Sequence, residues 1–413
     1  MRRSSAVGGS RAMCGRLVRI VSLLLLIPWG AAPALAQQED EPTRVVILGV
    51  GHSTQLVVEA QRPAALRAFF DRVAPDVIAV ERSPEEFARG DHYEFTYEIQ
   101  HLALPYAHER GLPVYPIDWI PSKDDMLLGF GVDLEAVPFL RGGGQGFLAF
   151  PAPDETDLPL FFADSDEDRA SRRAIWEAEW EPVRRDMPRR LFLYRTFLQA
   201  QRIAAVAGMH PGRTILVPIG ANHKDDIERI LGSHPQIDII QPSSFGEPTP
   251  SEIEAAIRRE DLVAIAVFNL LGVQSQTENV DFDWMGRTIA RLEAAGGLPA
   301  EIRLLAVRLG VLTGEVSSQE AIAAYGALSR GDPGATGFSW NGVQDPSRLD
   351  SYFDPFGNLS VPERVRVELA REQYKLGRVD AGDAVLEALA SELPRRKAVQ
   401  LRAYWREHLV GSK

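Results

Sequence analysis

Four ionisable side chains of this sequence each follow a short apolar run, and they are of types that bind metal ions or move protons. The runs span residues 45–49, 76–80, 113–117 and 214–219, and they lead to His52, Glu81, Asp118 and His223. Both histidines end a Gly-x-x-His pattern, which begins at Gly49 and at Gly220. One such pattern is a weak signal, but two of them beside Glu and Asp indicate a shared site.

Two kinds of chemistry fit these residue types. In the first, His52, Glu81 and His223 bind a divalent transition metal such as Mn, Co or Zn. Such a metal lowers the pKa of a bound water to about 7 and polarises a carbonyl. In the second, without metal, one histidine acts as general base toward water, Glu81 orients it and an arginine stabilises the oxyanion. Neither arrangement is specific to hydrolysis.

The apolar runs have the length and continuity of strands that are buried on both faces. Residues 62–73 and 224–231 show helical spacing of apolar residues, so strand, helix and strand alternate along the chain. The predicted fold is therefore α/β, with a central, mostly parallel sheet flanked by helices. Because ligands bind at the carboxyl ends of strands in such sheets, the four polar groups are expected in one crevice.

An arginine lies on an apolar stripe of the long helical stretch that ends near residue 207. Leu191, Tyr194, Arg195, Leu198 and Arg202 fall at helical spacing there. An arginine in this company is unusual unless a carboxylate or a ligand meets it. The alternative is that Arg195 lies at the edge of the stripe and extends its charged end into water.

Glu98 and His101 form a Glu-x-x-His pair, one helical turn apart. Di-iron carboxylate bundles use this spacing, but they need a second such pair and two further glutamates on facing helices. We find no such partners in the sequence. The pair is therefore interpreted as part of a solvated or partly packed helix face.

The chain divides into three predicted parts. Residues 1–36 resemble a secretory signal, with five arginines before an apolar core at 20–26 and small residues at 34–36; an uncleaved anchor is the alternative. Residues 37–245 form the α/β domain, with an inserted loop or lid at 121–163. Residues 246–413 form a helical C-terminal region. We expect an exported, periplasmic or extracellular protein without a membrane span in the mature chain.

Charge and cysteine content exclude several classes of function. The 413-residue chain has a formal net charge of −12, and removing the five arginines of residues 1–36 changes it to −17. Such a chain is a poor candidate for binding nucleic acid. Its single cysteine, Cys14, lies in the predicted signal, so the mature chain has no disulfide and no thiolate nucleophile.

The order of these motifs over residues 44–235 resembles that of the TraB/TIKI superfamily, a group related to erythromycin-esterase-like and ChaN-like haem-binding proteins. The resemblance implies an α/β fold whose functional positions are His52, Glu81, Arg195 and His223, with Asp118 and Arg82 as further members. Arg189, Arg190 and Arg202 lie on the same segment as Arg195 and are alternatives to it. TIKI proteins are regarded as metal-dependent peptidases, whereas the esterase branch opens lactones with a histidine-activated water.

Three functions follow as expectations. The first is an extracytoplasmic hydrolase of a peptide or ester bond, a metallopeptidase or an esterase, acting on a small-molecule or peptide substrate. The second is a non-catalytic protein that binds haem or a metal. The third is a scaffold whose helical C-terminal region binds a partner protein. The first two require the four strand-end residues to lie close together.

Overall fold

The computed structural model describes residues 41–91, 93–130, 157–177, 187–330, 337–343 and 345–410. The predicted signal segment, 1–36, and residues 131–156 of the predicted lid lie outside these ranges. The described part of the lid contains helix α4, Lys123–Phe130. Asp40–Lys413 form one compact unit. None of the described helices is both long and apolar enough to cross a membrane.

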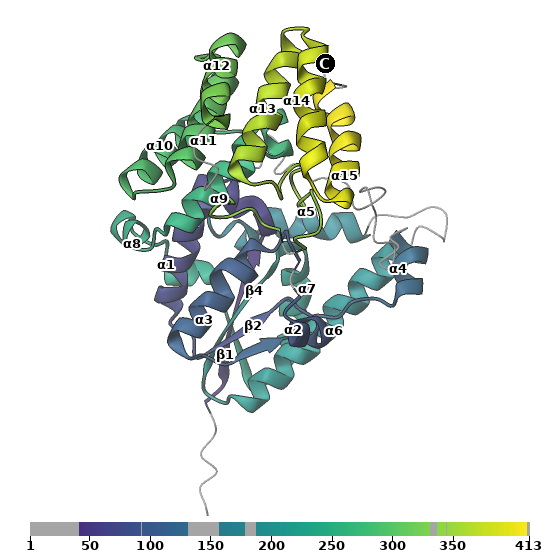
Figure 1. The fold of residues 1–413 in the computed structure, drawn as a ribbon. Coiled ribbons are helices and arrows are strands. Elements are labelled where there is room, and N and C mark those ends of the chain that lie inside the picture. The colour runs from purple at the N-terminus through teal and green to yellow at the C-terminus, as the bar shows by residue number, and fades with distance from the viewer. Residues whose placement is uncertain are drawn as a thin grey trace, which may run out of the picture. The chain divides into compact units, whose positions relative to one another are not determined.

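A five-stranded, wholly parallel sheet lies at the centre of the α/β part (Figure 1). Its order is β3-β2-β4-β1-β5, with β1 at Thr43–Val50, β2 at Val77–Val80, β3 at Val114–Pro116, β4 at Thr214–Gly220 and β5 at Ile237–Ile240. The α/β prediction is confirmed, and the four predicted runs are strands. The edge strand β5 was not predicted.

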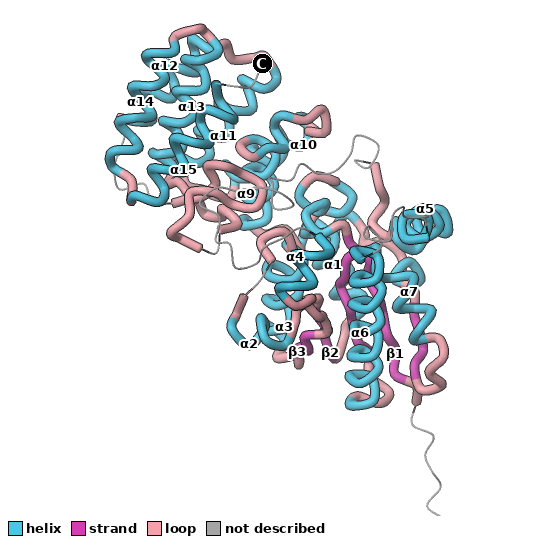
Figure 2. Tube along the Cα trace, turned by 90° about the vertical axis from the view of Figure 1, so that its right-hand side faces the viewer, coloured by secondary structure: helices cyan, strands magenta, loops and turns pink. Residues whose placement is uncertain are grey.

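The central strands carry a core on each face, because successive side chains of a strand point to opposite sides. Val46 and Leu48 of β1 join a cluster with α1, Pro63–Val73, and α3, Leu104–Arg110. Val45 and Ile47 join a second cluster with α6, Met187–Met209, and α7, Ala221–Leu231. Helices α6 and α7 thus cover one face of the sheet (Figure 2). Burial on both faces explains why these strands are continuous apolar runs.

Short helices connect the remaining elements of the α/β part. They include α2 at Pro84–Arg89, a π-helical turn at Glu98–Ala103 and α5 at Asp166–Glu177. Residues 164–207 were predicted as a long helical stretch that Pro182 and Pro188 break or kink. The structure describes two helices in it, α5 and α6, and Pro182 lies outside the described residues. Pro188 lies in the first turn of α6, where its missing N–H has no helical partner to lose.

The C-terminal region is helical, as predicted. Its helices are α8 at Pro250–Ala255, α9 at Arg259–Leu270, α10 at Phe282–Ala294, α11 at Pro299–Thr313, α12 at Ser318–Ser329, α13 at Val361–Lys375, α14 at Val379–Glu392 and α15 at Arg395–Trp405. Helix α9 was not predicted, because residues 261–270 are all buried and show no polar face. Its apolar residues join the same core as α1 and β1.

A buried ion pair connects α9 to α1. Arg67 Nη1 of α1 donates to Asp261 Oδ2 of α9 at 2.7 Å, and the Tyr97 hydroxyl donates to Asp261 Oδ1, also at 2.7 Å. Both charged side chains are less than a tenth exposed. The Asp261 carboxylate therefore has a partner for each oxygen in a region with little access for water.

We expect Asp261→Ala to lower the free energy of unfolding by about 3 kcal/mol, because it leaves the buried guanidinium of Arg67 without its carboxylate. Urea denaturation followed by circular dichroism measures this loss. The control is Glu254→Ala, which breaks an exposed pair with Arg291 and is expected to change stability little. Equal stabilities for the two variants would contradict a structural role for the Arg67–Asp261 pair.

Candidate active site

The register of the sheet brings the two Gly-x-x-His patterns to one edge. Strands β1 and β4 are neighbours, and Val50 at the end of β1 is level with Gly220 at the end of β4. His52 and His223 follow these ends at once, while Glu81 follows β2 and Asp118 follows β3. All four predicted residues therefore lie at the carboxyl ends of adjacent strands, where α/β proteins bind ligands.

Arg195 of α6 binds both strand-end carboxylates. Its Nε and Nη2 donate to Asp118 Oδ1 and Oδ2 at 2.7 and 2.6 Å, and Nη2 also donates to Glu81 Oε1 at 2.7 Å. Burial opposes the charge of Arg195, but the two carboxylates raise its pKa, so the guanidinium stays protonated. Among the described residues, no partner binds Nη1. Arg195, rather than Arg189, Arg190 or Arg202, is the arginine in this cluster.

Glu81 is the central residue of the cluster. Its side chain is 3% exposed, and its Oε2 accepts the backbone N–H of Gly220 at 2.7 Å. His223 Nε2 lies 3.6 Å from Oε1, the oxygen that Arg195 also contacts. A buried carboxylate needs such partners, because each oxygen loses water on burial. Glu81 thus connects the ends of β2 and β4 to α6.

His52 is held on the other side of this cluster by Glu98. His52 Nδ1 lies 2.9 Å from Glu98 Oε1, and Gln55 donates to the second Glu98 oxygen at 2.8 Å. The backbone of His52 has φ = 52°, a left-handed conformation that is uncommon outside glycine and that often marks functional residues. Phe95 packs edge-on against the imidazole, with ring centroids 5.2 Å apart.

The close approach of His52 explains the glycine at the end of β4. A Cβ placed on Gly220 would lie 2.9 Å from His52 Nε2 and 3.5 Å from Glu81 Oε2. Both atoms therefore approach the same point above Gly220, and only glycine leaves room for them. His52 Nε2 and the Glu81 carboxylate thus border one small space.

His223 is oriented by α6. Thr196 Oγ1 lies 2.7 Å from His223 Nδ1 and donates its own proton to the carbonyl of Phe192 at 2.8 Å. The hydroxyl must then accept from the Nδ1–H, so Nε2 of His223 carries the lone pair. The ring of Phe192 stacks on the imidazole, with centroids 4.6 Å apart. His223 therefore presents an acceptor nitrogen on the side of Glu81.

The pKa values of the two histidines are shifted in opposite directions. Burial disfavours the charged form of His52, but the charge and hydrogen bond of Glu98, with help from Glu81, raise its pKa above 6.5. Burial, together with the positive charges of Arg195 and His52, lowers the pKa of His223 to about 3. Titratable pairs whose pKa values are driven apart are typical of acid–base catalysis. Of the two imidazoles, His52 therefore keeps its proton to the higher pH.

The carboxylate–imidazole contact at Glu98 and His52 is the part of the site that sequence analysis missed. Glu98 is fully buried and contacts His52, whereas its Glu-x-x-His spacing was interpreted as a solvated or partly packed face. Its neighbour His101 accepts a hydrogen bond from Trp340 instead. Arg82 lies outside the cluster, since its Nε donates to the carbonyl of Asp91. Among the described residues, the buried carboxylate of Glu98 is the only group that contacts His52 Nδ1.

The donor set fits a metal ion poorly. Within the described ranges, no group of three or more His, Cys, Asp or Glu side chains is arranged to hold one. The obstacle is Glu81, whose oxygens already accept from Arg195 and from the Gly220 N–H. A divalent ion at His52 and His223 would have to displace these donors and lie close to a guanidinium. The contacts therefore favour the metal-free alternative.

Comparisons of this chain with protein-family models, with curated proteins and with solved structures find no match. The chemistry of the site therefore has to follow from its own geometry. Its accessible parts are the side chains of His52 and Arg195, which are 24% and 26% exposed, whereas Glu81, Asp118 and His223 are buried beneath them.

We expect the imidazole of His52 to titrate above pH 6.5 in a ¹H–¹³C NMR experiment and the imidazole of His223 to stay neutral near pH 7. Glu98→Gln removes the charge that raises the pKa of His52 and is expected to lower it. Because the pKa is raised by folding, His52 stabilises the fold below pH 6.5, and this contribution is lost as pH rises through the raised pKa. An unchanged His52 titration in the variant would contradict the role of Glu98.

Gly220→Ala is expected to displace His52, because the new Cβ would lie 2.9 Å from Nε2. The measurements are the His52 chemical shifts and the melting temperature, both of which should change. Gly208→Ala in α6 is the control, since a Cβ there meets no atom within 4 Å. Native His52 shifts in Gly220→Ala would show that the imidazole does not lie above residue 220.

Proposed function

We propose that this protein is an extracytoplasmic hydrolase of a peptide or ester bond and a relative of the TraB/TIKI superfamily. One observation carries the proposal: the Nε2 atoms of His52 and His223 lie on the side of Glu81, which Arg195 holds in place. A proton acceptor, a second imidazole and a cation at one strand edge are the groups that water attack on a carbonyl requires. The substrate is a small molecule or a peptide that reaches His52 and Arg195 from solvent.

His52 acts as the general base in the proposed mechanism. Its Nδ1–H donates to Glu98, so Nε2 is free to accept a proton from water. Glu98 orients the imidazole and stabilises the imidazolium that forms, as the aspartate does in a Ser-His-Asp triad. His223 Nε2 accepts the second hydrogen of the same water and fixes its direction. The hydroxide equivalent then attacks the carbonyl carbon of the substrate.

Arg195 acts on the charge that this attack creates. The carbonyl oxygen becomes an oxyanion, and Nη1 of Arg195 donates a hydrogen bond to it. Because Asp118 and Glu81 already bind the Nε and Nη2 edge of the guanidinium, the Nη1 donor is positioned before the substrate binds. Collapse of the tetrahedral intermediate breaks the bond to the leaving group, which takes the proton from the His52 imidazolium. The acid and alcohol or amine leave, and His52 returns to its neutral form.

A metal site is the second candidate, and one observation favours it. His52 Nδ1 is held by a carboxylate and His223 Nδ1 by a hydroxyl, as in histidines that bind metal through Nε2. Binding of Mn, Co or Zn would require Glu81 to exchange its present partners. Metal analysis of the purified chain and haem titration separate these alternatives. Stoichiometric metal, or a Soret band that disappears in His52→Ala, would support metal or haem binding instead.

The test of the hydrolase uses residues 37–413, assayed against a panel of esters and peptides. We expect His52→Ala to lower kcat roughly 10²–10⁴-fold, the range for loss of general acid–base catalysis. His223→Ala is expected to lower kcat as well, because it removes the acceptor that directs the water. The far-UV circular dichroism spectrum is expected to stay unchanged. His108→Ala is the control, because this exposed histidine of α3 lies outside the cluster. Full activity in both site variants would disprove the assignment.

The pH dependence of the same reaction identifies the base. A base must be unprotonated, so kcat/KM is expected to rise with pH through the raised pKa of His52. Glu98→Gln is expected to move this limb to lower pH and to reduce the maximal rate. If kcat/KM of Glu98→Gln rises at the same pH as that of the unaltered protein, a group other than His52 is the base.

A further inference from the structure

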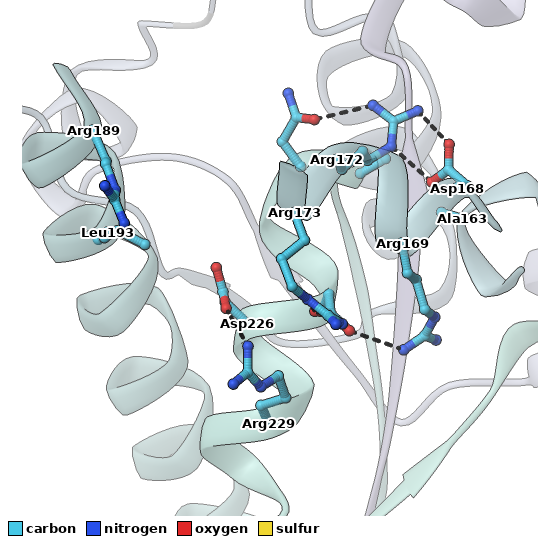
Figure 3. A pocket seen from close by; sticks show the side chains of 12 residues that line it. Ala163, Asp168, Arg169, Arg172, Arg173, Arg189, Leu193, Asp226 and Arg229 are labelled. Carbon is cyan, nitrogen blue, oxygen red and sulfur yellow. Dashed lines mark hydrogen bonds and ion pairs between the residues drawn. The ribbon is translucent and has the colours of Figure 1, made fainter. Parts of the chain in front are cut away.

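A cavity of about 210 Å³ lies beside the candidate site, between α5, α6 and α7 (Figure 3). Among the described residues, five arginines line it: Arg169, Arg172 and Arg173 from α5, Arg189 from α6 and Arg229 from α7. The hydrolase mechanism uses none of them. At about 30 Å³ for each molecule, the cavity has room for roughly seven waters, or for one small anion with part of its hydration.

The cavity is positive within an acidic protein. Among the described residues, five arginines and three aspartates line it, and Glu228 pairs with Arg169 at 2.6 Å, so this group has a formal charge of +1. The whole chain, in contrast, carries −12, with 45 basic and 57 acidic residues. A concave surface of one sign concentrates the field and attracts ligands of the opposite sign. The excess of guanidinium groups over carboxylates in the described lining therefore favours an anion.

Ion pairs at the wall hold three of the arginines in place before any ligand binds, and the first is Arg169, whose Nη1 donates to Glu228 at 2.6 Å. Arg172 makes two bonds to Asp168, at 2.7 and 2.8 Å, and Arg173 Nη2 donates to Asp225 at 2.6 Å. The Nε of Arg169 is buried and has no hydrogen-bond partner among the described residues. Guanidinium groups fixed in this way lose little side-chain entropy on binding, and their planar donors match phosphate and carboxylate oxygens.

The start of α7 adds to this positive potential. Ala221 and Asn222, the first two residues of the helix, line the cavity, and the N-cap residue Gly220 has no side chain to cap the first turn. Free N–H groups and the helix dipole make the start of a helix attractive to anions. Two independent features, the arginines and the helix start, thus favour the same kind of ligand.

We propose that this cavity binds an oxyanion, the phosphate or carboxylate group of a small ligand. The inference does not rest on the hydrolase mechanism, although the same two helices serve both places. Leu193 of α6 lines the cavity, and its neighbour Phe192 stacks on His223. Leu193 also offers an apolar contact for a ligand that carries more than the anionic group.

Isothermal titration of residues 37–413 with inorganic phosphate at low ionic strength tests the proposal. We expect binding that the double variant Arg173→Gln/Arg229→Gln weakens roughly tenfold or more, since each charge-assisted hydrogen bond is worth about tenfold in affinity. Arg287→Gln is the control, because this exposed arginine pairs with Glu59 on another surface. Circular dichroism and melting temperature verify that the double variant folds.

A variant that is expected to strengthen binding shows that the effect of the arginine variants is not merely a loss of structure. Asp226→Asn removes a negative charge from the lining and is expected to tighten phosphate binding severalfold. Phenyl phosphate identifies the source of the anion: tighter binding than phosphate indicates a larger ligand that contacts Leu193, and equal binding indicates a free oxyanion. Absence of binding by the unaltered chain, or equal affinity in the double variant, would overturn the proposal.

Discussion

The candidate site depends on the guanidinium of Arg195, whose positive charge compensates two buried carboxylates. Glu81 and Asp118 lie at the ends of adjacent strands, and an unpaired carboxylate there would cost several kcal/mol, roughly the scale of a whole protein's stability. Arg195 contacts both, so α6 must lie across the ends of β2 and β3. The position of α6 in turn places Thr196 and Phe192 against His223. A single charge pairing thus orders one side of the site.

The two histidines start from the same sequence pattern and reach opposite environments because their strands lead into different structures. Strand β4 continues directly into α7, whose first turn is packed under α6, so His223 loses water and its pKa falls. After β1 the chain enters a short 3₁₀ helix at His52–Leu56, with His52 in a left-handed conformation and a quarter exposed. Glu98 then raises its pKa. The fold, rather than the motif, sets the opposite pKa shifts of the two histidines.

The sequence predicted the parts of this fold that depend on local pattern. Continuous apolar runs indicated β1 to β4, and the rule that parallel strands end at one edge was enough to place their terminal residues together. Contacts between distant segments carry no such local pattern. Glu98 is 46 residues from His52, and its burial follows from tertiary packing alone. Helix α9 was not predicted for a related reason, since full burial removes the polar face by which amphipathic helices are recognised.

Helix α6 serves both the strand-end site and the arginine cavity because its faces differ. Phe192, Thr196 and Gln199 recur at helical spacing and point toward His223 and Asp118, whereas Arg189 and Leu193, four residues apart, line the cavity. A chain with a large net negative charge repels anions at long range, so attraction is confined to the cavity, within about one Debye length. Burial is the main cause that lowers the pKa of the neighbouring His223, ahead of the positive charges of Arg195 and His52, and an anion in the cavity would oppose only those charges. Such a ligand would therefore leave the main cause of the low pKa of His223 unchanged.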